Sequence, residues 1–533
     1  MRSNLILFLN IFTLNFALTF GVTKTMSASA QLENTARYII TETGPNSSFD
    51  PLNADQTQNL PVMRMLYLTP LEVSDDDKLR STVLSEFSYQ RESKTIVFEV
   101  RRGLSYSNGD TLTVEDVVLA IKRMALARPL FPVLREIQGL DDWKKQPAPL
   151  LTNPSGIKVR NNRIEIQLSE DIDHPLFRFT LELFSIIPKS CIDLNSGKLN
   201  CQIPPFSGPY ELSENKLAAD HSRLFRRRNS LADGFFKDTP KEIIFEYLPP
   251  ESLLKKGVHG RNWVAAGSER LYLPEEMKQI RSDFAFNGLV KNRFSYAVFN
   301  PNVQPFDKAE CRLFFAQMLR SALVSAGVPV ESIQGGISPK IITGYQSLQE
   351  LTHSQGVLSK ESEVHCRRVF KGSKIRWGFT KNMPFNREAD ALLQVFKELS
   401  VKNFEPLVFE SRDESFNAFL SGKSSIHFGS SGLWALDPFG DLQMFFTPNL
   451  HKSQFFSSKD QPMQDLIARL RRADNPEHRK ALALELNRHI FKNALFNVYS
   501  HSRRFFVADK SSSLAKIPMA ISGAAPWQVF SGL

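Results

Sequence analysis

Residues 101–118 constrain the fold of this 533-residue chain most, because they join a strand, a turn and a helix in one unbroken run. The residues just before them, 95–100, end in an apolar alternation that predicts a strand. Asn108-Gly109 tolerates positive φ and predicts a tight turn. Thr113 and Asp116 have the spacing of a capping box, which predicts the start of a helix. The buried face of this helix is expected to consist of Val117, Val118, Ile121 and Met124.

Strand-like and helix-like stretches alternate from about Lys374 onward, with short connections between them. This alternation predicts a largely parallel α/β sheet with helices on both faces. Nearer the end, Asn475-Pro476-Glu477 supplies a cap, a first-turn proline and an early acid, and predicts a long helix through Phe491. A chain of this length is expected to form two or three domains.

The first 30 residues have the pattern of a secretory signal peptide. Arg2 and Lys24 flank the apolar run Leu5–Val22, no acidic residue is present, and Ala28-Ser29-Ala30 supplies small residues for cleavage. An uncleaved membrane anchor is the alternative. Polar residues within the run favour cleavage, so we expect residues 1–30 to be removed on export.

Basic residues outnumber acidic ones by 66 to 56, and removal of the two basic residues in 1–30 leaves 64 against 56, or +8. Most of this excess is spread along the chain, but Arg223, Arg226, Arg227 and Arg228 lie close together. Because nucleic-acid-binding motifs are absent, we expect no nucleic-acid partner and interpret this cluster as a solvated loop; an acidic partner is the alternative.

The chain contains four cysteines, an even number that suits one or two disulfides in an exported protein. Cys191 with Cys201 would close a short loop, and Cys311 with Cys366 would connect parts of the second half. Buried free thiols are the alternative. The spacing is not that of a structural zinc site.

Several further motifs occur in a fixed order: Ser48-Phe49-Asp50-Pro51-Leu52, then 83–89, then 206–212, then a run from Phe299 to Leu323. Together with 101–118 they resemble the family 5 extracytoplasmic solute-binding proteins, the oligopeptide, dipeptide and nickel receptors of ABC importers. The third motif keeps the Gly-Pro-Tyr core of the family's "GTGPYkl". Residues 251–257 depart from the family's "aL.sGevD", so contacts there are expected to differ.

The resemblance implies an α/β, two-lobe periplasmic-binding-protein-like fold with an extra subdomain in the first lobe and mixed sheets flanked by helices. We expect the first lobe at 31–286, its extra subdomain at about 60–200, the second lobe at 287–501, and a tail at 502–533 that returns to the first lobe. The lobes would close around a peptide or similar small solute. A periplasmic location, an ABC-importer permease as partner and a monomeric state are also expected.

Peptide-binding members of the family often have a W-x-A-D motif whose carboxylate binds the ligand's α-ammonium group. Anchoring this motif on Trp434 gives Asp437 that role. Anchoring instead on Asp437-Pro438, as a later family Asp-Pro, leaves Trp434 at the carboxylate's position. We favour the first register because it needs no gap. From the residues alone, Asp437 is also a common turn residue before proline, and Trp434 a possible core residue.

Two other segments are expected to contact the ligand. Main-chain groups from Ser48 and Phe49 to Pro51, and near Gly432, are predicted to pair with an extended peptide as an added strand would.

Enzymatic activity is not expected, because the chain lacks a G-x-S-x-G elbow, an H-E-x-x-H pair and a G-x-x-x-x-G-K loop. No cofactor is expected. Two other functions stay open: a metal or metallophore receptor on the same scaffold, using His427 or His365, and a sensory or chaperone-like binding protein that serves no importer.

Overall fold

The structure is a computed structural model of the chain. It describes residues 35–41, 49–53, 60–73, 78–127, 132–172, 175–213, 222–228, 239–255, 262–268, 272, 274–328, 349–351, 358–380, 386–409, 412–432, 461–473, 476–494 and 497–510. The predicted signal peptide, 1–30, lies outside these residues, as does most of the predicted tail. Within the described residues, no helix combines the length and apolar character needed to cross a membrane.

A ten-stranded mixed sheet runs through the whole molecule in the order β14-β13-β15-β12-β16-β11-β1-β10-β9-β8. Its pairs are parallel at β13–β14, β13–β15, β1–β10 and β1–β11 and antiparallel elsewhere. Its strands are β1 (Thr35–Ile40), β8 (Tyr210–Leu212), β9 (Arg223–Arg227), β10 (Glu242–Tyr247), β11 (Trp263–Ser268), β12 (Ala285–Phe299), β13 (Lys374–Thr380), β14 (Asn403–Phe409), β15 (Ile426–Gly432) and β16 (Asn497–Ala508).

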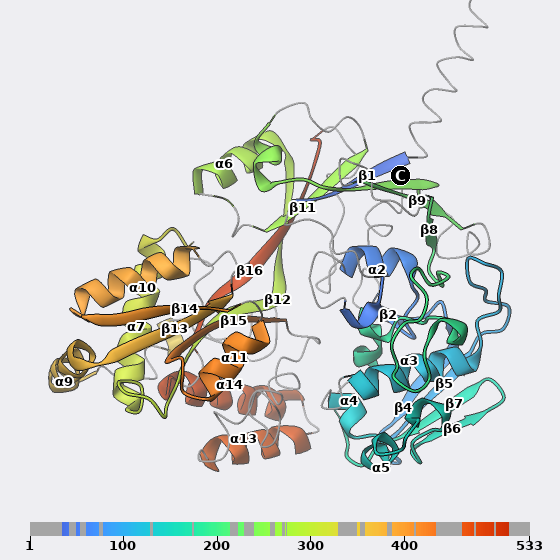
Figure 1. The fold of residues 1–533 in the computed structure, drawn as a ribbon, viewed down its shortest axis with the longest axis horizontal. Helices are drawn as coiled ribbons and strands as arrows, with labels where there is room; N and C mark the ends of the chain where they lie inside the picture. Colours follow the sequence, from blue (N-terminus) through green and yellow to red (C-terminus); the bar gives the residue numbers. More distant parts are fainter. Residues whose placement is uncertain are drawn as a thin grey trace, which may run out of the picture.

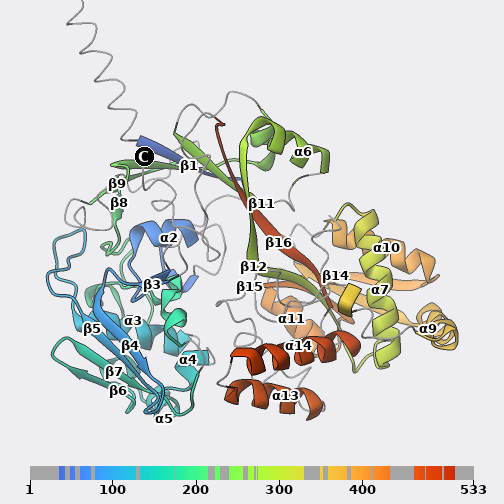
Figure 2. The same cartoon turned by 180° about the vertical axis from the view of Figure 1, so that it is seen from behind.

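Two long strands, β12 and β16, connect the two halves of the molecule. They pair antiparallel from Ala285 opposite Ala508 to Ala297 opposite Asn497, with irregularities between Val290 and Phe294 and after Ser295. At one end β16 pairs with β11, and at the other β12 pairs with β15. Figures 1 and 2 show two bodies of structure joined by these strands.

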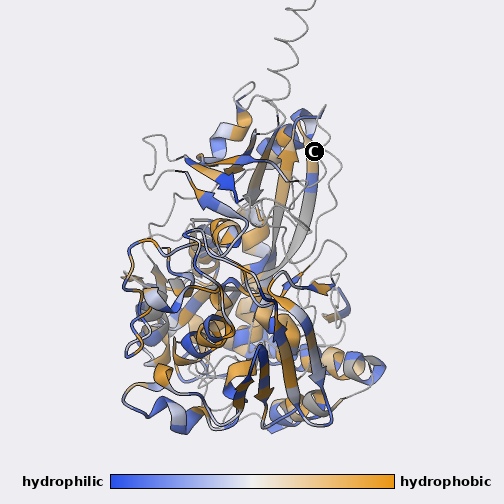
Figure 3. Ribbon diagram, turned by 90° about the vertical axis from the view of Figure 1, so that its right-hand side faces the viewer, coloured by the Kyte–Doolittle hydropathy of each residue, from blue (hydrophilic) through white to orange (hydrophobic). Residues whose placement is uncertain are grey.

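Helices cover both faces of the sheet in the body that follows β12, as the sequence predicts. Alternate residues of β12 point to opposite faces, because side chains of a strand alternate. Ala297 and Phe299 join a core with helices α7, α9 and α10, whereas Tyr296 and Val298 join a core with α13 and α14. The helices are α7 (Ala309–Ser325), α9 (Lys360–Gly372), α10 (Asn386–Glu398), α11 (Arg412–Leu420), α13 (Gln461–Arg472) and α14 (Pro476–Lys492). The other body, on the right of Figure 1, faces the viewer in Figure 3, where its helices and strands carry hydrophobic as well as hydrophilic stretches.

The other body contains a four-stranded antiparallel sheet, ordered β4-β5-β7-β6, whose core includes the apolar face of α3. The predicted face residues of α3 are all buried, and each such side chain contributes about 1.5–3 kcal/mol. The remaining elements are α2 (Leu60–Leu66), β2 (Glu72–Val73), β3 (Leu79–Arg80), β4 (Leu84–Gln90), β5 (Thr95–Val100), α3 (Val114–Ala127), α4 (Pro132–Arg135), α5 (Leu140–Lys144), β6 (Ile157–Arg160), β7 (Arg163–Gln167) and α6 (Pro274–Asp283), with short 3₁₀ turns that include Pro51–Asn53.

The segment 101–118 has the predicted local structure. Gly109 has a φ of 88°, the left-handed conformation that the turn requires. The Thr113 amide donates to Oδ2 of Asp116 at 2.9 Å, and the Asp116 amide donates to the Thr113 hydroxyl at 3.4 Å. These reciprocal bonds form the capping box at the start of α3. The Asp116 carboxylate also accepts the Lys189 amide at 3.1 Å, so the cap connects α3 to the turn before Cys191.

Both predicted disulfides are present. Cys191–Cys201 closes a loop with a sequence separation of 10, and Cys311–Cys366 joins α7 to α9 over a separation of 55. Among the described residues no cysteine is free, so the alternative of buried thiols is wrong.

The arginine cluster is not a solvated loop, and that interpretation was wrong. Arg223, Arg226 and Arg227 lie in strand β9, where Arg226 pairs with Glu242 at 3.2 Å. Arg223 and Arg228 are only 9% and 5% exposed. The Arg228 guanidinium donates to the carbonyls of Ser105, Phe206 and Gly208 at 2.6, 2.9 and 3.0 Å, which offsets the cost of burying its charge.

Candidate functional site

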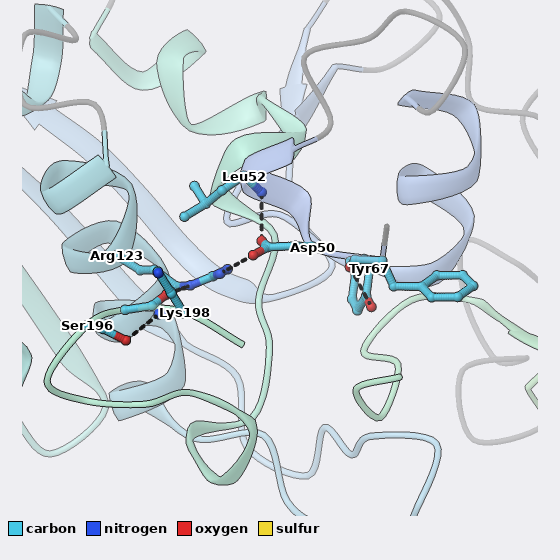
Figure 4. Close-up of polar contacts among 8 residues, drawn as sticks. Asp50, Leu52, Tyr67, Arg123, Ser196 and Lys198 are labelled. Carbon is cyan, nitrogen blue, oxygen red and sulfur yellow. Dashed lines mark hydrogen bonds and ion pairs between the residues drawn. The ribbon is translucent and has the colours of Figure 1, made fainter. Parts of the chain in front are cut away.

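The segment Phe49–Asn53 is fixed in place by its aspartate. Oδ1 of Asp50 accepts the Leu52 amide at 2.9 Å, and Oδ2 accepts Nη2 of Arg123 at 2.6 Å (Figure 4). The hydrogen bond from the Leu52 amide to Asp50 lies at the start of the 3₁₀ turn Pro51–Asn53, as expected of an aspartate that precedes a turn. Both carboxylate oxygens of Asp50 are therefore engaged within the protein.

Phe49 is also held from two sides. Its carbonyl accepts the Tyr67 hydroxyl at 3.2 Å, and its ring lies 5.2 Å from the Arg223 guanidinium (Figure 4 shows the tyrosine contact). Burial raises the pKa of the Tyr67 phenol well above its ordinary value, and the nearby Asp50 carboxylate raises it further. The phenol therefore remains a hydrogen-bond donor at physiological pH, and part of the main chain predicted to pair with a ligand already has an internal partner.

The Gly-Pro-Tyr loop packs directly against the end of α2, the helix that precedes Tyr67. The Gly208 amide donates to the Leu66 carbonyl at 2.8 Å, and Ser207 bridges the Leu68 amide and the Ile186 carbonyl at 3.0 and 2.8 Å. Tyr210 is fully buried and donates to the Pro240 carbonyl at 2.7 Å. This motif thus supports the body that carries Phe49.

The other described site residue, Gly432, ends strand β15 opposite Arg293 of β12. Phe49 packs on the core of the first body, whereas β15 belongs to the second body (Figure 1). Ser48, Trp434 and Asp437 lie outside the described residues. The two described site residues therefore lie in different bodies, and their roles, like that of the Asp437 carboxylate, stay predictions.

The two histidines considered for a metal receptor occupy different environments. His427 is 2% exposed in β15 and lies 5.7 Å from the Phe419 ring and 6.4 Å from the Tyr296 ring, whereas His365 is exposed on α9. In the part of the chain that the structure describes, no three His, Cys, Asp or Glu side chains are grouped to hold a metal ion.

Sequence reasoning missed Arg123 and Tyr67, which fix the segment around Asp50. Arg123 lies directly before Met124 on α3, and its side chain is only 5% exposed. A charged residue next to the buried face of an amphipathic helix is a weak signal, since long side chains commonly reach solvent from such positions.

Comparisons with known proteins indicate which family and which fold this chain resembles. The sequence model for bacterial extracellular solute-binding proteins, family 5 (middle), matches residues 81–317. Over these residues the chain is similar to solute-binding protein family 5. The chain is also 30% identical over 131 residues to the periplasmic oligopeptide-binding protein OppA of Haemophilus influenzae, a match that spans 22% of the chain and 24% of that relative.

Several solved structures are similar to this chain over nearly its whole length. Haemophilus influenzae OppA, in complex with the peptide RPPGFSPFR, gives a TM-score of 0.71 at 13% identity over 93% of this chain and 98% of that one. PBP AgaA from A. tumefaciens R10, in complex with agropinic acid, gives 0.71 at 15% identity over 93% and 98%. NikA from Brucella suis, in complex with Fe(III)-EDTA, gives 0.68 at 13% identity over 93% and 99%. The predicted two-lobe, periplasmic-binding-protein-like fold is confirmed.

Proposed function

We propose that this protein is the extracytoplasmic substrate-binding component of an ABC-type importer and captures a peptide or similar small solute between two closing lobes. The observation that carries the proposal is the pair β12 and β16, which alone among the described strands pair with each other across the junction of two separately cored bodies. Such a junction suits hinge motion, in which ligand contacts from both lobes are complete only in the closed state.

The ligand class rests on the sequence relative, which is an oligopeptide-binding protein by name. The fold also accommodates agropinic acid in AgaA and Fe(III)-EDTA in NikA, so the scaffold itself does not select peptides. We propose a peptide because the Trp434 and Asp437 motif supplies a carboxylate suited to an α-ammonium group.

The remaining features of the proposal follow from the same function. Export through cleavage of residues 1–30 would deliver the protein to the periplasm, where a permease would accept its ligand. The lobes would divide at 31–286 and 287–501, with the extra subdomain at about 60–200 and residues 502–533 returning to the first lobe. The relatives are binding proteins; we propose that this chain likewise binds without chemical conversion, as a monomer and without nucleic acid.

Asp437→Ala is expected to lower the affinity for free-amino peptides about tenfold or more, because a charge-assisted hydrogen bond contributes roughly 1.5–3 kcal/mol. The measurement is calorimetric titration with an equimolar pool of synthetic tri-, tetra- and pentapeptides, followed by titration with the tightest binder. N-acetylation of that peptide should cost the wild type a similar factor and cost Asp437→Ala little more, because both changes remove the same interaction.

Asp441→Ala is the matched control, since it removes a carboxylate four residues farther along the same stretch. Equal affinity of wild type and Asp437→Ala would assign Asp437 to the turn before Pro438 and support the other register. Absence of binding for every peptide in the pool would contradict the peptide receptor itself.

A further inference from the structure

We propose that Arg123 is a positioning residue for ligand binding. Its side chain connects the loop closed by the Cys191–Cys201 disulfide to the segment Phe49–Leu52 and so holds that segment in place. This inference rests on the proposed function, because residues 49–51 of that segment are predicted ligand contacts. The guanidinium makes two contacts in opposite directions. Nη2 binds Oδ2 of Asp50 at 2.6 Å, and Nε donates to the Gly197 carbonyl at 2.6 Å (Figure 4).

The Arg123–Asp50 ion pair is largely buried, so each charge depends on the other for its stabilisation. The two side chains are 5% and 16% exposed, so neither charge is well solvated once its partner is removed. Removing one partner of such a pair leaves the other charge buried and uncompensated, and the segment then rearranges to reach water. The geometry of Phe49–Leu52 therefore depends on Arg123.

The loop that receives the other contact is itself rigid. The Cys191–Cys201 disulfide closes its base, and Ile192 and Leu199 form a β-bridge beside it. At its tip, Gly197 has a φ of 72° and donates its amide to the Asp193 carbonyl at 2.7 Å. The tip lies so close to α3 that an added Cβ would be 3.3 Å from the Leu126 side chain. A carbonyl held in this way fixes the guanidinium plane.

Asp50 and Phe49 are the residues through which these contacts fix the main chain of the segment. With Oδ2 occupied by Arg123, Oδ1 of Asp50 is directed to the Leu52 amide, and the Tyr67 hydroxyl fixes the Phe49 carbonyl. These contacts set the main-chain direction immediately after Ser48, which is predicted to pair with the ligand. A pre-ordered segment loses less conformational entropy when ligand binds, so its loosening should appear as weaker binding.

A purely structural ion pair in the same body offers a matched control. Nη2 of Arg37, on β1, contacts both carboxylate oxygens of Glu246, on β10, at 2.8 Å, with side chains 30% and 13% exposed. It joins two strands and has no contact with Phe49–Leu52 among those that the structure describes. Arg37→Met should therefore affect stability without affecting the segment.

The test compares Arg123→Met with Arg37→Met in two readouts. The first is hydrogen exchange of the Leu52 amide in the unliganded protein, and the second is calorimetric affinity for the tightest peptide from the pool. Arg123→Met is expected to speed Leu52 exchange and to weaken peptide binding about tenfold, whereas Arg37→Met leaves both within about twofold. Cys191→Ser/Cys201→Ser should shift both readouts the same way, and should add less when combined with Arg123→Met.

Asp50→Asn keeps the shape of the side chain and replaces Arg123→Met if that variant fails to fold. Arg123→Lys should recover part of the lost affinity, because an ammonium reaches Asp50 but lacks the fixed fork that also reaches Gly197. Unchanged Leu52 exchange in Arg123→Met would overturn the inference, as would unchanged peptide affinity. If the wild type binds no peptide, the proposed function fails, while the exchange comparison still decides whether Arg123 orders the segment.

Discussion

Gly208→Ala is expected to lower the free energy of unfolding by about 3 kcal/mol, because the new methyl group would overlap backbone rather than a movable side chain. A Cβ at this position would lie 2.5 Å from the Leu66 carbonyl carbon, 2.5 Å from the Met65 oxygen and 2.6 Å from the Tyr67 nitrogen. To relieve this overlap, the loop that carries Gly208 would have to move away from α2. That movement would break the hydrogen bond from the Gly208 amide to the Leu66 carbonyl. Urea denaturation followed by tryptophan fluorescence measures the change.

Gly372→Ala is the matched control, because no atom lies within 4 Å of its added Cβ and it ends helix α9. Alanine there should be neutral or slightly stabilising, since it restricts the unfolded chain and favours helix. Equal effects of the two substitutions would mean that the loop and α2 are not packed as the structure has them.

Loss of the Cys311–Cys366 disulfide is expected to lower the free energy of unfolding by about 4 kcal/mol. The bond closes a loop with a sequence separation of 55, and the entropy that a cross-link removes from the unfolded chain grows with loop length. The variant is Cys311→Ala/Cys366→Ala, measured by urea denaturation under oxidising conditions. Both sulfurs are fully buried, so cavity formation adds to the loss.

The shorter Cys191–Cys201 loop provides the comparison within the same chain. Its separation of 10 predicts a loss of about 3 kcal/mol, smaller than that for the longer loop. A larger loss for Cys191→Ala/Cys201→Ala than for the Cys311 pair would contradict an account in which unfolded-chain entropy dominates.

Local features of the fold were predictable because their causes lie within a few residues. The turn at Asn108-Gly109 and the capping box of Thr113 and Asp116 depend on neighbours at most three positions apart. The helix face that follows repeats within one short segment, so its burial could be stated before any tertiary contact was known.

Features fixed by distant partners were not predictable in the same way. The pairing of β12 with β16 joins residues about 200 positions apart, and nothing local marks it. Arg228 was misread for the same reason, since its three carbonyl partners belong to residues 105, 206 and 208. Its neighbours Arg226 and Arg227 are also charged, so the local pattern indicated solvent rather than a buried guanidinium.

The candidate site also combines residues that the sequence pattern predicts with residues fixed by distant partners. The resemblance predicts Phe49 and Gly432 as ligand contacts, but the residues that fix Phe49 and its neighbour Asp50 come from α3 and from just beyond α2. Asp437 and Trp434 were chosen by motif register alone, and they lie outside the described residues. Their roles therefore depend on the binding experiments above rather than on geometry.

Small-angle X-ray scattering of the purified protein, with and without the tightest peptide from the pool, tests most directly whether two rigid bodies close on a solute. The radius of gyration should fall on addition of saturating peptide, while the folded content measured by circular dichroism stays constant. An unchanged radius of gyration at full calorimetric occupancy would contradict capture by lobe closure.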